Sequence, residues 1–179
     1  MNILAFAASN SRTSINKALV SYAADMLEEG IVEDATIELL DLNDFETPLF
    51  SVDKEKEDGI PDAAHRFYKK IGDADALLVS FAEHNGNYTA AYKNLFDWTS
   101  RIDAKVYQNK PAVLLSTSPG PGGGRNVMAS AKGSAPHFAM DVKADFSLPR
   151  FYDNFDMENR QVSDPDIRTG LESTLAAFK

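Results

Sequence analysis

The chain has 179 residues, of which 44% are hydrophobic and 25% charged, and this ordinary globular composition excludes a mostly disordered protein. It has no cysteine, which excludes a disulfide scaffold, a thiolate zinc site, an iron–sulfur cluster and a cysteine nucleophile. With a formal net charge of −9 and no basic cluster longer than Lys69-Lys70, we expect no nucleic-acid partner. Since roughly 150 residues make one domain, the length predicts a single domain over residues 1–179.

Apart from Asn2, the first eight residues are apolar, but the run is short and the polar segment Ser9-Asn10-Ser11-Arg12 follows at once. A secretory signal needs a basic start and a longer apolar core, and a membrane span needs about 20 apolar residues. We therefore expect no membrane association and a cytoplasmic protein.

Short apolar runs predict the β-strands. Three of them, 3–8, 76–81 and 112–116, are almost continuously apolar, which is typical of parallel strands that are covered on both faces. The run 37–42 contains Glu38 and Asp41 and is expected nearer an edge of the sheet. A fifth strand is more weakly marked at 144–148.

Helical patterns separate these runs. Apolar residues at a spacing of about 3.6 predict a helix from Ser14 to about Glu29, where Gly30 ends it, and another that opens at Pro61. Further helices are predicted over 87–101, 125–135 and 164–178.

Strands and helices alternate along the chain, which predicts an α/β fold with an open parallel sheet and helices on both faces. Five strands in this length fit the flavodoxin-like strand order 2-1-3-4-5. The one long connection, 43–60, carries the charged run 53–58, which we interpret as a solvated loop. Connections of this length are often functional or interfacial.

In such a sheet, ligands bind beyond the carboxyl ends of the central strands. The loop after the first strand, residues 9–16, offers four hydroxyls, two amides and the guanidinium of Arg12 at the start of a helix. Free N–H groups and about half a positive charge at a helix N-terminus favour an anion. The loop lacks the glycines of a dinucleotide or P-loop motif, so it predicts a cradle for a single terminal phosphate. The alternative is that Thr13 or Ser14 simply caps the helix.

The loop after the third strand contains Glu83, His84, Asn85 and Gly86. An Asn-Gly turn permits positive φ and leaves backbone N–H groups that can face a flat heteroaromatic ring. His84 could equally be structural, and Glu83 could stabilise the turn or the N-terminus of the following helix.

The loop after the fourth strand, residues 116–125, holds four glycines together with Thr117 and Ser118. Glycine lets a ligand approach the backbone closely, although a flexible connector would look similar. Together the three loops predict a site for one phosphate, a polar linker and a planar ring, which describes FMN.

At this point the sequence resembles a known family, the flavodoxin-like NAD(P)H-dependent FMN reductases, which include chromate and quinone reductases. The resemblance spans about residues 1–130. Its motifs are Ser9-x-Ser11-Arg12-x-Ser14-Ile15-Asn16, Glu83-His84-Asn85-Gly86 followed by Lys93-Asn94-Leu95-Phe96-Asp97-Trp98, and Thr117-Ser118-x-Gly120 with Gly123-Gly124. His84 stands where the family usually has Tyr.

The resemblance implies that these motif residues bind FMN. It also implies an oxidoreductase in which hydride passes from NADPH or NADH to N5 of FMN and then to a small acceptor: a quinone, a flavin, an azo compound or a metal oxyanion. The cofactor carries this chemistry, so no catalytic acid or base and no metal are expected. A homodimer or homotetramer is implied as well. The alternatives are a non-enzymatic flavodoxin-like electron carrier and a scaffold without flavin.

Overall fold

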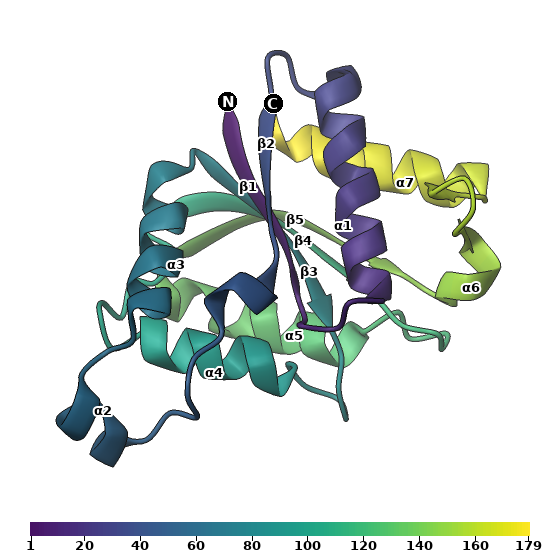
Figure 1. The fold of residues 1–179 in the computed structure, drawn as a ribbon. Coiled ribbons are helices and arrows are strands. Elements are labelled where there is room, and N and C mark those ends of the chain that lie inside the picture. Colours follow the sequence, from purple (N-terminus) through teal and green to yellow (C-terminus); the bar gives the residue numbers. More distant parts are fainter.

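A five-stranded parallel sheet forms the centre of the computed structural model, which describes residues 1–179 (Figure 1). In spatial order the strands are β2 (Thr36–Leu40), β1 (Asn2–Ala8), β3 (Ala76–Ala82), β4 (Lys110–Thr117) and β5 (Met140–Leu148). All neighbours are parallel. The predicted fold class and the order 2-1-3-4-5 are therefore confirmed.

Helices cover both faces of the sheet (Figure 1). One face carries α1 (Ile15–Met26) and α7 (Pro165–Leu175), and the other carries α3 (Asp62–Asp73), α4 (Ala90–Thr99) and α5 (Arg125–Ser134). Because side chains alternate along a strand, Ile3 and Ala5 pack with α1 while Leu4 and Phe6 pack with α3. Both faces are buried, which explains the continuous apolar runs of the central strands. No helix is long and apolar enough to cross a membrane.

Two predicted boundaries move because polar side chains cap the next element. The strand predicted at 37–42 ends at Leu40, since the Asp41 carboxylate accepts the N–H of Asn43 at 2.9 Å and opens a 3₁₀ turn, Leu42–Phe45. The helix predicted from residue 87 begins at Ala90, because the Thr89 hydroxyl accepts the Tyr92 N–H at 3.2 Å. The last strand is longer than the weak pattern 144–148 suggested.

The charged run 53–58 is not a loop. It forms the short helix α2 (Val52–Asp58), which begins where the Ser51 hydroxyl accepts the Lys54 N–H at 3.1 Å. None of its residues is buried, so the expectation of a solvated segment holds while the loop assignment is wrong. The Arg101 side chain bonds the Glu55 carboxylate at 2.9 Å and ties α2 to the end of α4.

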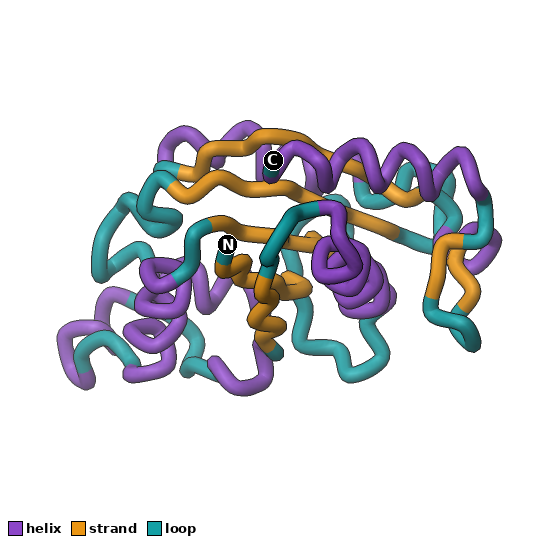
Figure 2. The backbone as a smooth tube through the Cα atoms, turned by 90° about the horizontal axis from the view of Figure 1, so that it is seen from above, coloured by secondary structure: helices purple, strands orange, loops and turns teal.

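The sequence patterns did not predict a small unit between β5 and α7. It consists of α6 (Phe151–Asn154) and a hairpin of two short strands, β6 (Phe155–Asp156) and β7 (Gln161–Val162). Figure 2 shows the hairpin at one end of the molecule, opposite the end that carries α2. Phe151, Phe155 and Val162 are buried and extend the core beneath α1 and α7.

Candidate functional site

The three loops after β1, β3 and β4 meet at the carboxyl edge of the sheet around a hollow of about 230 Å³. The lining residues are Ser9, Ser11, Thr13, Ser14, Ile15, Asn16, Ala82, Glu83, His84, Thr117, Ser118, Pro119 and Tyr152. The structure thus brings together nine of the residues that the sequence singled out. The other five, Arg12, Asn85, Gly86, Gly120 and Gly123, belong to the same loops but do not line this hollow.

The first loop is a cradle of free backbone donors. The Ser9 hydroxyl accepts the Ser11 N–H, and the Ser14 hydroxyl caps α1 by accepting the Lys17 N–H, both at 3.2 Å. Over residues 10–16, the N–H groups without a hydrogen-bond partner are those of Asn10, Arg12, Thr13, Ile15 and Asn16. Capping uses the oxygen of Ser14 and leaves its hydroxyl proton free. Five N–H groups at the positive end of a helix suit an anion.

Arg12 is exposed and has no hydrogen bond or ion pair within the chain. It lies between two residues that line the hollow, Ser11 and Thr13. Its guanidinium is therefore uncommitted and can turn toward an anion held in the cradle.

Asn16 connects α1 to the strands β3 and β4, and its side chain is not free to bind a ligand. Its side chain is buried, and its amide nitrogen donates to the Thr117 carbonyl at 3.2 Å. Its amide oxygen accepts the Thr117 N–H at 3.0 Å and the Ser80 hydroxyl at 2.9 Å. Every polar atom of the side chain is used inside the fold, so only the backbone N–H of Asn16 can reach a ligand.

The second loop forms the tight turn that its sequence indicated. His84 and Asn87 exchange backbone hydrogen bonds of 2.9 and 3.1 Å, and Asn85 and Gly86 have φ values of 53° and 79°. The N–H groups of these two central residues have no partner and remain available. The His84 imidazole also makes no hydrogen bond.

Glu83 caps a helix, but not the one that follows it. Its carboxylate accepts the N–H groups of Asn126 and Val127, each at 2.9 Å, at the start of α5. The negative charge lies against the positive end of this helix and links the second loop to the third. Both carboxylate oxygens face α5, so Glu83 positions the loops instead of presenting a free acceptor.

Two of the four glycines of the third loop, Gly123 and Gly124, are required by the protein's own packing. Gly123 has φ +57°, and a Cβ there would lie 2.9 Å from the Leu148 carbonyl oxygen. Gly124 has φ +81°, and its Cβ would lie 3.0 Å from the Ser116 side chain. The close approach is to β4 and the end of β5, which explains these two glycines without a ligand. Thr117 is likewise committed, since its hydroxyl donates to the Leu148 carbonyl at 2.8 Å.

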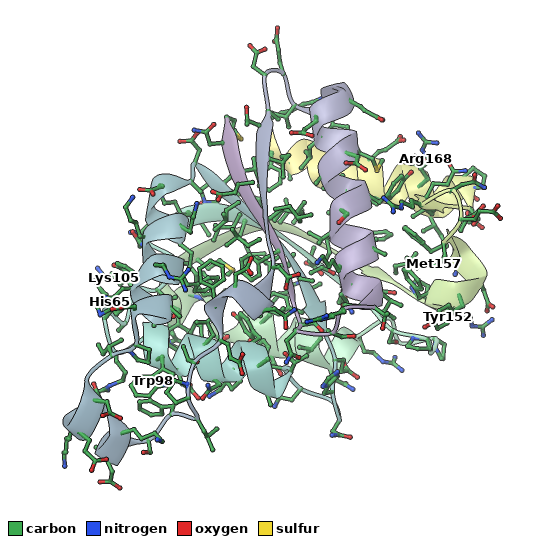
Figure 3. The ribbon with its side chains drawn as sticks, in the orientation of Figure 1. His65, Trp98, Lys105, Tyr152, Met157 and Arg168 are labelled. Carbon is green, nitrogen blue, oxygen red and sulfur yellow. The ribbon has the colours of Figure 1, made fainter.

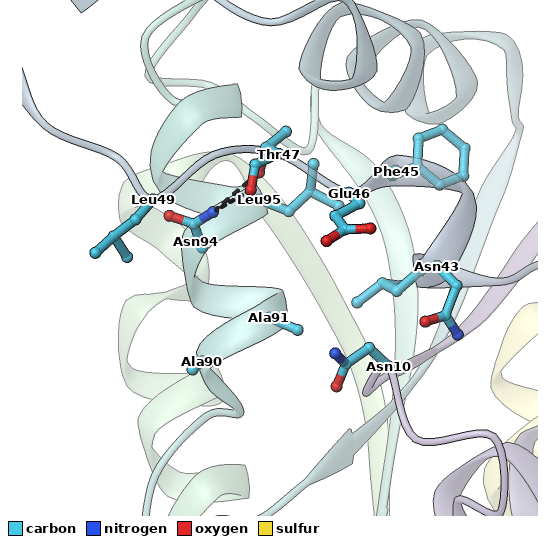
Figure 4. A pocket seen from close by; sticks show the side chains of 11 residues that line it. Asn10, Asn43, Phe45, Glu46, Thr47, Leu49, Ala90, Ala91, Asn94 and Leu95 are labelled. Carbon is cyan, nitrogen blue, oxygen red and sulfur yellow. Dashed lines mark hydrogen bonds between the residues drawn. The ribbon is translucent and has the colours of Figure 1, made fainter. Parts of the chain in front are cut away.

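A second hollow, of about 360 Å³, adjoins the first loop at Asn10 (Figure 4). It is shared by Asn10, the connection after β2 and the first turns of α4. The Asn94 side chain bonds Thr47, Pro48 and Phe50 of that connection at 2.8–3.2 Å and holds this wall in place. Trp98, which is buried, supports the same wall by donating to the Pro48 carbonyl at 2.7 Å. The hollow has the size and the partly apolar lining to admit a small planar group.

Four residues that line the hollow were not among the predicted site residues. Thr13, Ala82 and Pro119 belong to the three predicted loops, whereas Tyr152 comes from α6, in a part of the chain where no motif was found. Only the folding of α6 onto the third loop brings Tyr152 to the site. No group of three His, Asp or Glu side chains is placed to hold a metal ion.

A profile of the family described as NADPH-dependent FMN reductase matches residues 1–153. The NADPH:quinone oxidoreductase of Arabidopsis thaliana is 34% identical over 126 residues, which cover 70% of this chain and 62% of that protein. The NAD(P)H-dependent FMN reductase of Pseudomonas aeruginosa is 32% identical over 120 residues, which cover 67% of this chain and 61% of that protein. This chain therefore spans less than two thirds of either relative's length.

Many solved structures share the fold, among them the following two. The Paracoccus denitrificans flavoenzyme FerB, an NAD(P)H:(acceptor) oxidoreductase, superposes with a TM-score of 0.76 at 24% identity, covering 99% of this chain and 94% of that one. An FMN-dependent NADH-azoreductase from Bacillus anthracis, solved in complex with FMN, gives 0.67 at 11% identity and covers 99% of each chain. Identities this low establish the common fold alone.

Proposed function

The chain belongs to the NADPH-dependent FMN reductase family, and from that premise we propose that it is an NAD(P)H-dependent oxidoreductase that binds FMN at the loops after β1, β3 and β4. The observation that carries the proposal is the cradle of five unpartnered backbone N–H groups at the start of α1. We further propose that residues 1–179 act as one FMN-binding domain.

The donor set fits a phosphate monoester. The free N–H groups of the first loop, the hydroxyls of Ser11 and Ser14 and the guanidinium of Arg12 are all donors, and no carboxylate lies within the loop. Charge-assisted bonds from such donors are stronger than neutral ones. Because the Asn16 side chain is hydrogen-bonded to Thr117 and Ser80, we propose that its role is structural and that it holds the cradle against the sheet.

The two other loops supply the walls for the ribityl chain and the ring. The free N–H groups of Asn85 and Gly86 suit the polar edge of an isoalloxazine, and Ser118 lines the same hollow as the cradle residues. The ties from Asn16 to Thr117 and from Glu83 to α5 fix the spacing of these walls before a ligand arrives. This pre-organisation lowers the entropic cost of binding.

When bound, FMN supplies the redox chemistry, in which two electrons from NAD(P)H pass to a small acceptor. The chain's own residues bind, orient and shield. The third loop cannot direct the full positive end of α5 at the cofactor, because the Glu83 carboxylate already occupies the first free N–H groups of that helix. For the acceptor we propose a quinone, a free flavin, an azo compound or a metal oxyanion, and for the assembly a cytoplasmic homodimer or homotetramer.

The test is an anaerobic titration of the purified protein loaded with FMN. NADH and NADPH are added in separate runs, and the flavin absorbance is followed. Stoichiometric bleaching by at least one of the two supports the reductase. If dithionite bleaches the flavin while neither nicotinamide does, an electron carrier replaces it. If the protein binds no FMN, the proposal fails altogether.

A further inference from the structure

Three aromatic residues close together near the C-terminus have opposite environments. Phe151 and Phe155 are buried, with 0% and 4% of their surfaces exposed, and their rings stack at 4.7 Å. Tyr152, between them, is 66% exposed and meets Phe151 edge-on at 5.5 Å. Figure 3 shows it on the side of the molecule where α1 begins. The neighbouring rings thus anchor α6 while Tyr152 stays outside the core.

The position of Tyr152 is fixed to the third loop of the site. The Arg150 N–H donates to the Gly120 carbonyl at 2.9 Å, and the Phe151 N–H donates to the Ser118 carbonyl at 3.1 Å. On the other side, the Asn154 side chain donates to the Pro149 carbonyl at 2.9 Å. Two backbone bonds immediately before Tyr152 therefore hold its Cα against the loop that walls the hollow.

Tyr152 lines the same hollow as the cradle residues Ser11 and Ser14, and its hydroxyl has no hydrogen-bond partner. Exposed aromatic rings are common on protein surfaces, but Tyr152 also lines a polar cavity, and its hydroxyl is a donor without a partner. A tyrosine in such a place offers a flat apolar cover and one O–H group to a ligand beneath it.

We propose that Tyr152 is a further ligand-contacting residue, whose hydroxyl donates to the phosphate of the bound flavin and whose ring covers that end of the site. This inference rests on the proposed function. It assigns a binding role to the C-terminal part of the chain, which carries none of the motifs. It also gives the hollow a side-chain donor that comes from α6, in addition to the backbone N–H groups of the first loop.

The experiment compares FMN with riboflavin, which has the same ring and ribityl chain but no phosphate. Dissociation constants are measured by flavin fluorescence for the full chain and for Tyr152→Phe, Tyr152→Ala and Met157→Ala. Met157 is a matched control, since it is 55% exposed on the neighbouring hairpin and does not line the hollow.

Tyr152→Phe keeps the ring and removes only the hydroxyl, so it should weaken FMN binding about tenfold and leave riboflavin binding unchanged. Tyr152→Ala should weaken FMN binding further, and Met157→Ala should change neither ligand. If Tyr152→Phe binds FMN as tightly as the unaltered chain, or weakens both ligands equally, the phosphate contact is wrong. If the unaltered chain binds no FMN, the proposed function itself has failed, which is a different result.

Discussion

Asn16 and Thr117, which are 101 residues apart in sequence, bond to each other in both directions: the Asn16 side chain donates to the Thr117 carbonyl at 3.2 Å and accepts its N–H at 3.0 Å. The side-chain amide of Asn16 thus bonds both backbone polar groups of Thr117, as a residue of a neighbouring strand would. Since Asn16 lies in the first turn of α1, the pair sets the distance between the first and third loops of the site.

We expect Asn16→Ala to destabilise the fold by about 2–3 kcal/mol, because it leaves buried polar groups of Thr117 and Ser80 without partners. Urea unfolding of the flavin-free protein measures this. Asn10→Ala is the matched control, since Asn10 lies in the same loop, is exposed, makes no hydrogen bond and should change stability little. Unchanged stability of Asn16→Ala together with lost FMN binding would instead make Asn16 a direct ligand.

Removal of the Arg12 side chain should weaken FMN binding without changing the stability of the fold. Its side chain has no partner in the chain, so Arg12→Ala should leave the free energy of unfolding within about 0.5 kcal/mol of its original value. A charge-assisted bond contributes about 1.5–3 kcal/mol, so FMN affinity should fall by about 10- to 100-fold. Equilibrium titration with FMN and with riboflavin measures the two affinities.

Riboflavin binding should not change in Arg12→Ala, because riboflavin has no phosphate. Lys54→Ala on α2 is the control for loss of one positive charge, and it should leave both affinities unchanged. Equal losses for the two flavins in Arg12→Ala would show that the guanidinium does not hold the phosphate.

Glu83 should matter to stability through α5. Glu83→Ala removes the acceptor of two backbone N–H groups and should cost about 1–2 kcal/mol in unfolding free energy. Glu83→Gln keeps an acceptor oxygen and should cost less. Glu57→Ala, at an exposed residue of α2 without hydrogen bonds, is the control. A Glu83→Ala protein as stable as the control would contradict the capping role.

The ion pair between Lys17 and Asp41 should make the stability of the fold depend on pH in the acidic range. The hydrogen bond from Lys17 and those from Asn43 lower the pKa of Asp41 from 3.8 to about 2. Because this pKa is lower in the folded than in the unfolded state, the pair stabilises the fold above about pH 4, and its contribution disappears as the pH falls toward about 2.

We therefore expect Lys17→Met to be less stable than the unaltered chain at pH 7, with the difference shrinking between about pH 4 and pH 2. The side chains of Lys17 and Asp41 are 39% and 34% exposed, so solvent screening limits the difference to about 0.5–1 kcal/mol. Lys69→Met is the control, because its pair with Asp73 is far more exposed. A difference that stays constant with pH would exclude Asp41 as its source.

The sequence by itself determined the strand order, the edge of the sheet that carries the site and the three loops that form it. The strands and the loops follow from local signals, namely continuous apolar runs, capping residues and an Asn-Gly turn, whereas the strand order follows from the number of strands and their alternation with helices. The positive φ of Asn85 and Gly86 was predictable for the same reason, since it depends on four neighbouring residues.

The tertiary structure alone decided which polar side chains remain free for a ligand. Asn16, Glu83 and Thr117 look like ligands in sequence, but partners at least 31 residues away use their side chains. In the sequence, Gly123 suggests a backbone that a ligand can approach closely, but in the structure it is packed against the Leu148 backbone. Tyr152 carries no motif and reaches the hollow because α6 folds onto the third loop. A hydrogen bond between distant segments leaves no local pattern in the sequence. Only the folded chain therefore shows which donors and acceptors are already paired within the protein.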